Sequence, residues 1–152
     1  MIEEKSTDEV EKLLETMKPE QLDDFYKENR KYLKDEKKAF YYYMKDVVES
    51  KNILLKDMYL YAGITESYGG QILRMEKHTT NRDLIIRLCI AGHFSLPETN
   101  KALKLYDMPT LYAKDQRDAC FIVAINNRIY DIYRINEMLA QQNLPELSVK
   151  KY

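Results

Sequence analysis

The sequence predicts an all-α protein, and three observations lead to this expectation. Apolar residues recur at helical spacing through most of the 152-residue chain, as in Phe40, Tyr43, Met44 and Val47, and such spacing places them on one face of a helix. No segment shows the sustained apolar and polar alternation typical of a strand. Glycine and proline number only 4 each, so few residues are available to break helices.

The N-terminal part is expected to form two short acidic helices. The first should begin at Ser6 or Thr7 and end before Pro19, which suits the first turn of a second helix that runs to about Leu33. Residues 1–50 carry a net charge of −4. We therefore assign residues 1–35 as acidic N-terminal helices that precede the main domain.

The next predicted helix runs from Lys37 to about Ser50. It contains Tyr41, Tyr42 and Tyr43 in succession, which suggests a stacking platform for nucleic-acid bases. However, successive helical positions point about 100° apart. We therefore expect at least one of these tyrosines in the core and at least one on the surface.

Residues 54–75 are predicted to form two short helices joined by a turn. Gly63 can adopt the left-handed conformation that ends a helix. Thr65 is placed to cap the next helix by accepting a hydrogen bond from a backbone amide. Ile72 should pack this second helix against the first.

Two further helices are predicted before residue 108. Thr80 or Asn81 should cap a helix that ends at Ala91 and is closed by Gly92. A capping box, in which a serine is followed three residues later by a glutamate, then occurs at residues 95–98 and predicts a helix to about residue 106. We assign residues 36–108 as the main domain.

The C-terminal part approximately repeats the preceding hairpin. Arg-Asp at residues 82–83 recurs at 117–118, and Asn100 recurs as Asn136, with an offset of 35 residues at the start and 36 at the end. Two similar helical hairpins should therefore stack side by side, unless these few identities match by chance. Residues 109–152 would form a C-terminal hairpin packed on the main domain or extending it.

One face of the second helix in residues 54–75 carries side chains suited to reading DNA. At about 100° per residue, Ser67, Gln71 and Arg74 fall on one stripe, whereas Gly69 and Ile72 fall on the opposite side. Glutamine can bond an adenine edge, arginine a guanine edge or a phosphate, and serine either. The pattern indicates a DNA-binding helix-turn-helix; ordinary solvated surface groups are the alternative.

The candidate DNA-binding residues extend beyond this stripe. Glu66 could accept from a cytosine amino group, although the favoured role is to complement the helix dipole. Residues at nearby helix ends and loops should contact phosphates and set the register, namely Lys56, Lys77, His78 and Asn81. The complete set is Lys56, Thr65, Glu66, Ser67, Tyr68, Gln71, Arg74, Lys77, His78 and Asn81.

Two features of this segment argue against tight DNA binding. The net charge of residues 51–112 is only +2, so a dimer would be needed to supply affinity. Gly69 and Gly70 each cost a helix about 1 kcal/mol relative to alanine. Close approach of Gly69 to the preceding helix and of Gly70 to DNA would explain them, and a frayed or kinked helix is the alternative.

The region from about residue 40 to 105 resembles a λ-repressor/Cro-type helix-turn-helix domain of the xenobiotic-response-element family. Residues 62–68, Ala-Gly-Ile-Thr-Glu-Ser-Tyr, are similar to the family's turn and recognition-helix start, and residues 81–84, Asn-Arg-Asp-Leu, to its pattern before the fourth helix. The resemblance implies five helices, with residues 66–75 in the major groove.

The resemblance also implies roles for individual residues. By position, base or phosphate contacts would be inherited by Glu66, Ser67, Gln71 and Arg74. The chain departs from the family pattern at Tyr59, where a small alanine is usual, and at Gly69, where an apolar residue is usual. A large-for-small exchange against a small-for-large one could preserve volume while changing the angle between the helices.

Other classes of site find little support in the sequence. His78 and His93 lack partners at metal-ligand spacing, and no phosphate-binding glycine loop or nucleophile motif is present. We therefore expect no catalytic activity, cofactor or metal. Cys89 and Cys120 lie in apolar helical patterns and should be buried free thiols.

The sequence also bears on localisation. Its longest apolar runs are far shorter than the roughly 20 residues that cross a bilayer, and the first residues lack a basic flank and a hydrophobic stretch. We therefore expect a cytoplasmic protein that does not contact a membrane.

Together these patterns predict a bacterial-type, sequence-specific transcriptional regulator. Double-stranded DNA is the expected partner, and the C-terminal hairpin should form a homodimer or receive a protein partner. The alternative is an all-helical interaction adaptor or antitoxin-like module whose helix-turn-helix no longer reads DNA. The low positive charge, the paired glycines and the tandem hairpins suit that alternative.

Overall fold

The regular elements of the structure, a computed structural model, are all helices within the described residues, which are 14–22 and 36–148. The all-α expectation is confirmed for this part of the chain. In order, the elements are the 3-10 helix η1 (Pro19–Gln21) and the α-helices α4 (Glu36–Ser50), α5 (Leu55–Ala62), α6 (Glu66–Leu73), α7 (Arg82–Ala91), α8 (Leu96–Leu105), α9 (Gln116–Asn126) and α10 (Ile132–Gln141).

The two predicted N-terminal helices lie mostly outside the described residues. Pro19 occupies the first turn of a helix, as predicted, but that element is the short η1. The Gln21 side chain accepts a hydrogen bond from the Lys18 backbone N–H at 2.9 Å, which closes this turn from within.

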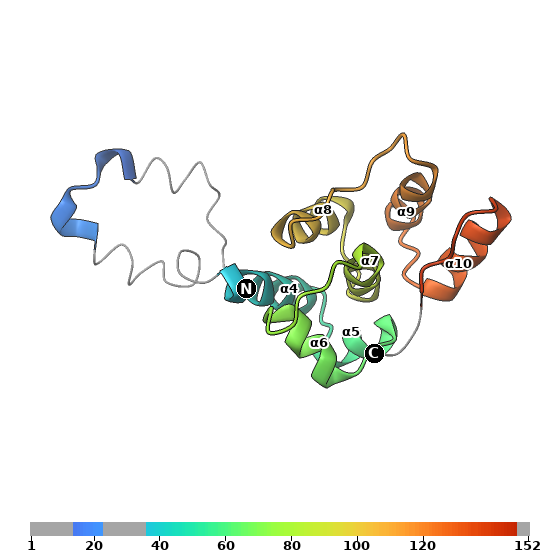
Figure 1. The fold of residues 1–152 in the computed structure, drawn as a ribbon, viewed down its shortest axis with the longest axis horizontal. Helices are drawn as coiled ribbons and strands as arrows, with labels where there is room; N and C mark the ends of the chain where they lie inside the picture. Colours follow the sequence, from blue (N-terminus) through green and yellow to red (C-terminus); the bar gives the residue numbers. More distant parts are fainter. Residues whose placement is uncertain (1–13, 23–35, 149–152) are drawn as a thin grey trace.

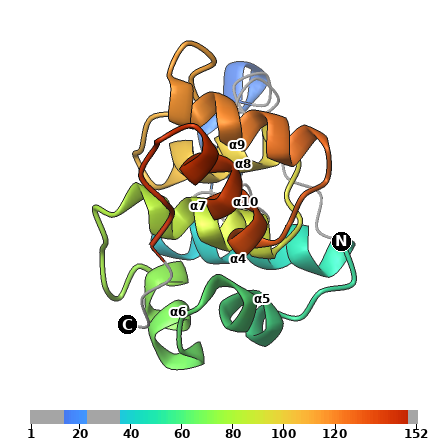
Figure 2. The ribbon, with the colours of Figure 1, turned by 90° about the vertical axis from the view of Figure 1, so that its right-hand side faces the viewer.

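Helix α7 forms the centre of the core, and all its residues from 84 to 91 are buried. It packs against α5, α8 and α10, and Figure 1 shows it in the middle of the helical body. Helix α4 packs against α5, α6 and α8. The helix pair α5 and α6 is therefore held from one side by α4, below which it lies in Figure 2.

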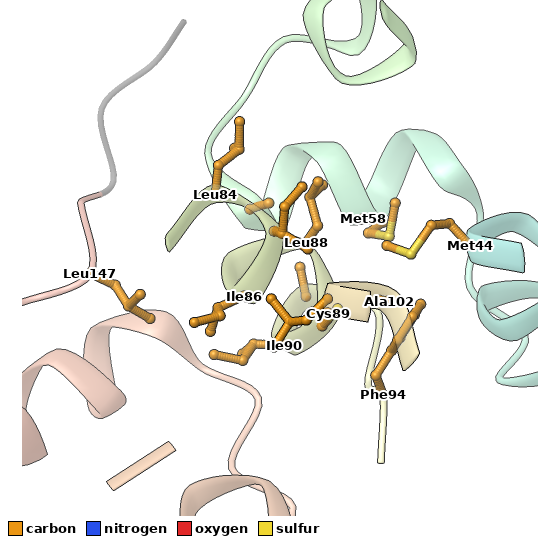
Figure 3. Packing of buried hydrophobic residues seen from close by; sticks show 14 of the residues in the cluster. Met44, Met58, Leu84, Ile86, Leu88, Cys89, Ile90, Phe94, Ala102 and Leu147 are labelled. Carbon is orange, nitrogen blue, oxygen red and sulfur yellow. The ribbon is translucent and has the colours of Figure 1, made fainter. Parts of the chain in front are cut away.

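A single hydrophobic cluster runs from Phe40 in α4 to Leu147 beyond α10. Side chains from residues 36–108 and from residues 109–148 both belong to it. Figure 3 shows Leu147 directed toward Ile86 of α7, and both side chains are almost completely buried, at 1% and 0% exposure. The C-terminal hairpin is thus packed on the preceding helices through a shared core.

The hairpins α7–α8 and α9–α10 are related by an approximate two-fold axis. Arg82 donates two hydrogen bonds to Asp118 at 2.8 and 2.9 Å, and Arg117 donates two to Asp83 at 2.8 and 2.7 Å. Correspondingly, α7 packs against α10 while α9 packs against α8. Such reciprocal contacts are the product of a two-fold. The predicted packing of two similar hairpins is confirmed, and their relation is a rotation.

Each arginine of these pairs also holds the segment that follows its own hairpin. Arg82 donates to the carbonyl oxygens of residues 109 and 110, both at 3.0 Å. Arg117 donates to those of residues 145 and 146 at 2.8 and 3.0 Å. The repeated arginine thus joins three segments of chain.

The repeated asparagines make matched contacts to the same segments. Asn100 Oδ1 accepts from the Leu111 N–H at 2.9 Å, and Asn136 Oδ1 accepts from the Leu147 N–H at 2.8 Å. Because these bonds fix the backbone, both leucine side chains are delivered into the core. The repeated arginine and asparagine therefore hold the segment that follows each hairpin, residues 109–111 and 145–147, against that hairpin.

The predicted helix caps are confirmed. Asn81 caps α7 by accepting from the Asp83 N–H at 3.1 Å, and Ser95 and Glu98 form the capping box of α8. Gly92 follows α7, but its φ is −85°. Its small size is what matters, since a Cβ there would lie 2.7 Å from Phe94.

Two predictions about partly buried residues are wrong. Tyr41, Tyr42 and Tyr43 are all half-buried, so none is fully in the core and none is fully exposed. Their amphipathic rings explain this, because Tyr43 packs edge-on against Phe94 while its hydroxyl donates to the Glu98 carbonyl at 2.9 Å. Cys120, expected to be buried, is also only half-buried.

Candidate functional site

The turn between α5 and α6 has the local geometry that the sequence predicts. Gly63 adopts the left-handed conformation, with φ 79° and ψ 27°. Thr65 is the N-cap of α6 and its Oγ1 accepts from the Tyr68 N–H at 3.1 Å. These two residues fix the direction in which α6 leaves α5, and Figure 2 shows the two helices side by side.

Close packing against Tyr59 explains Gly69. A Cβ on Gly69 would lie only 2.3 Å from Cδ1 of the Tyr59 ring, and Tyr59 is 4% exposed. The tyrosine ring therefore fills the space that a side chain at position 69 would need. Burial also raises the pKa of Tyr59 to about 12. The predicted close approach of Gly69 to the preceding helix is confirmed, and α6 continues through both glycines.

Gly70 is covered by the side chain of Arg74. A Cβ on Gly70 would lie 2.8 Å from Nη1 of Arg74. The guanidinium also donates to Glu76, with Nε 2.9 Å from Oε1. Arg74 thus lies back along the end of its own helix, 46% exposed.

Helix α6 is shorter than the predicted 66–75. It ends at Leu73, Arg74 is its C-cap, and Met75 has a positive φ of 55°. His78 therefore lies in the loop beyond the helix. Its ring instead stacks on Tyr106, with centroids 5.0 Å apart.

The face of α6 away from the core carries the remaining predicted side chains. Glu66 and Ser67 are exposed, Gln71 is half-buried, and Tyr68 is half-buried. The opposite face is buried and includes Ile72, which is fully enclosed. This part of the predicted polar face is thus accessible.

The flanking residues of the predicted set have mixed environments. Lys56 is exposed on α5, and the Lys77 Nζ lies 5.9 Å from the centre of the Tyr68 ring. Asn81 uses its side-chain oxygen to cap α7, so a phosphate contact would have to come from another of its polar atoms.

The charges around α6 nearly cancel. Around it are three basic and three acidic side chains, all exposed except the half-buried Asp57: Lys56, Arg74, Lys77, Asp57, Glu66 and Glu76. The Arg74 and Glu76 charges are already paired, and this hydrogen bond is the main cause of the lowered pKa of Glu76. A strong positive field at α6 is therefore lacking.

An aromatic groove that the sequence patterns do not predict lies on another part of the surface. The groove lies where the C-terminal ends of α5 and α7 meet the turn that leads into α10, and its lining includes Leu60, Tyr61, His93, Tyr130 and Tyr133. The signal available in the sequence is that the large residues Leu60 and Tyr61 lie off the helix face that contains Met58 and Ala62; in the structure they are 67% and 64% exposed.

Metal sites and membrane spans are absent from the described ranges. No three His, Cys, Asp or Glu side chains there are arranged to hold a metal ion, and no helix there has the length and apolar character to cross a bilayer. No protein-family model, curated protein or solved structure matches the chain.

Proposed function

We propose that this protein is a transcriptional regulator that binds double-stranded DNA through the exposed face of α6. One observation carries the proposal: Gly63 and Thr65 fix the start of an eight-residue helix whose inner face is buried while Glu66 and Ser67 are exposed. A helix held in this way by the helix before it can be inserted into a major groove. Gln71 and Arg74 would supply further base or phosphate contacts.

The local charge limits the expected affinity. With three basic side chains near α6, namely Lys56, Arg74 and Lys77, at most three phosphates per protomer would be neutralised there. The slope of log K against log salt should then be no steeper than about −2.7 per protomer. Binding should therefore be modest unless two protomers act together on one duplex.

Fluorescence polarisation against a diverse set of duplexes, at several salt concentrations, tests the proposal. If Gln71 and Arg74 contact bases, Gln71→Ala and Arg74→Ala should each weaken specific binding by about 1 to 3 kcal/mol. Gln141→Ala and Arg134→Ala, at exposed positions of α10, remove the same side chains elsewhere and should leave affinity unchanged. Equal effects at both locations would contradict a site on α6.

The pairing of Arg74 with Glu76 gives a second test of the same surface. Glu76 competes with DNA for the guanidinium and adds a like charge near phosphate. Glu76→Gln should therefore tighten DNA binding several-fold and steepen its salt dependence. Glu137→Gln, an equivalent change at an exposed site of α10, serves as control. Weaker binding by the Glu76 variant would show that Arg74 must stay paired to function.

An all-helical interaction module is the second candidate function. The near-neutral surface around α6 and the exposed aromatic groove favour it, because interfaces are rich in tyrosine and poor in clustered charge. Undetectable or salt-independent DNA binding in the polarisation titration would support this candidate over the first.

A further inference from the structure

The aromatic groove is built from three helix ends that are distant in sequence. Leu60 and Tyr61 come from the end of α5, Ala91 and His93 from the end of α7, and residues 128–133 from the turn into α10. Its volume is about 670 Å³. Ala91 and Ile132, at 1% and 4% exposure, are buried apolar residues of its lining, which also includes the charged Arg128 and Asp131.

The groove lies where the internal repeat is broken. The left-handed residues His93 and Arg128 correspond at an offset of 35, whereas the N-caps Ser95 and Asp131 correspond at 36. Phe94 and Ile129 also correspond at 35, because their N–H groups donate to the carbonyl oxygens of residues 89 and 124, both at 2.9 Å. Tyr130 is therefore the residue that the second turn adds.

The added tyrosine is ordered by a specific contact. Its ring stacks on His93, with centroids 4.2 Å apart and planes 11° from parallel. Burial, followed by the nearby Lys51 charge, lowers the pKa of His93. Tyr130 has no counterpart in the first hairpin and lines the surface groove. Binding explains such an added residue better than fold stability does.

Three side chains around the groove are unusually exposed for their size. Leu60, Tyr61 and Tyr133 are 67%, 64% and 71% exposed. From the 150–250 Å² that an aromatic side chain typically buries, the two tyrosines alone leave on the order of 300 Å² open to solvent. A standard interface buries about 800 Å² per partner, so this patch is large enough to be its centre.

We propose that the groove is a self-association surface, occupied by the same surface of a second copy of this chain. Charge complementarity favours this occupant, because Arg128 and Asp131 place opposite charges at one rim. A two-fold interface sets the same patch of each copy against the other, so Arg128 of one copy can pair with Asp131 of the second. The chain already joins its two hairpins by reciprocal Arg-Asp pairs, and its net charge of −1 opposes association little.

Self-association through this groove does not depend on DNA binding. A dimer would, however, supply the second protomer that tight DNA binding requires, because the local positive charge at α6 is weak. The two proposals can therefore fail separately: a dimer that binds no DNA retains this inference, and a monomer that binds DNA retains the other.

Sedimentation velocity of the full chain from 1 to 200 µM tests the inference. We expect a concentration-dependent species of twice the 18.1 kDa protomer mass. Tyr133→Glu should raise the dissociation constant at least tenfold. Tyr112→Glu is the matched control, since Tyr112 is 59% exposed but does not line the groove, and it should leave the dimer intact.

A milder variant separates loss of contact from loss of folding. Arg128 has a positive φ of 57°, which asparagine tolerates, so Arg128→Asn should keep the fold, checked by circular dichroism, while weakening the dimer several-fold. A wild-type chain that stays monomeric at 200 µM would overturn the inference. So would a dimer that withstands both Tyr133→Glu and Arg128→Asn.

Discussion

The two Arg-Asp pairs allow one interaction to be measured twice in different surroundings. Both pairs are bidentate, with donor-acceptor distances between 2.7 and 2.9 Å. The Asp118 side chain is 8% exposed and that of Asp83 is 22% exposed. Asp118 also accepts a third hydrogen bond, from the Tyr112 N–H at 3.0 Å. Asp118→Asn should therefore destabilise the fold more than the chemically identical Asp83→Asn.

The expected size follows from the exposure of these pairs. Breaking a fully buried ion pair costs about 3 to 5 kcal/mol, whereas an exposed pair contributes about 0 to 1 kcal/mol. Both pairs lie between these limits, and asparagine keeps one acceptor oxygen. We expect a loss of about 2 to 3 kcal/mol for Asp118→Asn and about 1 to 2 kcal/mol for Asp83→Asn.

Urea unfolding at pH 7 measures both losses as changes in the free energy of unfolding. Far-ultraviolet circular dichroism and tyrosine fluorescence are suitable probes, because the chain has 13 tyrosines and no tryptophan. Adding Arg82→Gln completes a double-mutant cycle with Asp118→Asn, for which we expect a coupling of about 1 to 2 kcal/mol. A greater loss from Asp83→Asn, or a coupling near zero, would refute the ranking by burial.

Three further outcomes follow from single positions. Gly69→Ala should destabilise the fold by about 1 to 3 kcal/mol despite the better helix propensity of alanine, because the added methyl overlaps Tyr59; Tyr59→Ala should relieve that penalty in the double variant, as thermal melting would show. Burial alone would raise the pKa of Asp118, but hydrogen bonds from Arg82 and the Tyr112 amide and the nearby arginine charges lower it overall. The unfolded chain therefore binds this proton more tightly than the folded chain does. The stabilisation that ionised Asp118 provides should be lost as pH falls below about 4 and through the folded pKa. This loss should be absent when the free energy of unfolding of Asp118→Asn is measured in urea against pH. Finally, a thiol-specific disulfide reagent should modify the half-buried Cys120 first and reach Cys89, which is fully buried, only on unfolding; equal rates would contradict this.

Local signals in the sequence were sufficient where a residue acts on its own backbone. Thr65, Asn81 and Ser95 cap the helices that they were expected to cap, because a cap needs only the amides two or three residues ahead. Gly63 likewise ends α5 by its own conformational freedom. Such features involve neighbours in sequence, and their geometry is nearly independent of the fold.

Features that depend on long-range packing could be predicted only in part. Gly69 indicated a close approach, and the ring that fills the space belongs to Tyr59, ten positions earlier. Helical spacing of about 100° per residue predicts Arg74 on an exposed stripe. In the structure the helix ends one residue before Arg74, and Glu76 pairs with its guanidinium. The exposure and chemistry of the α6 face suit DNA contact, whereas the equal numbers of acidic and basic side chains around it do not favour tight binding.

The repeat shows most clearly what a one-dimensional pattern leaves open. Equal spacing of Arg-Asp and Asn signatures is compatible with translation along a solenoid or with rotation into a pseudo-dimer. The crossing of the pairs, Arg82 with Asp118 and Arg117 with Asp83, together with the packing of α7 on α10 and of α9 on α8, distinguishes them. The offset between matched residues of the two hairpins changes from 35 to 36 in the turn before α10. Tyr130 is the added residue, and it lies at the surface in the groove. The matched positions thus stabilise the two hairpins, and the unmatched one lies in the groove where we propose that two copies of this chain associate.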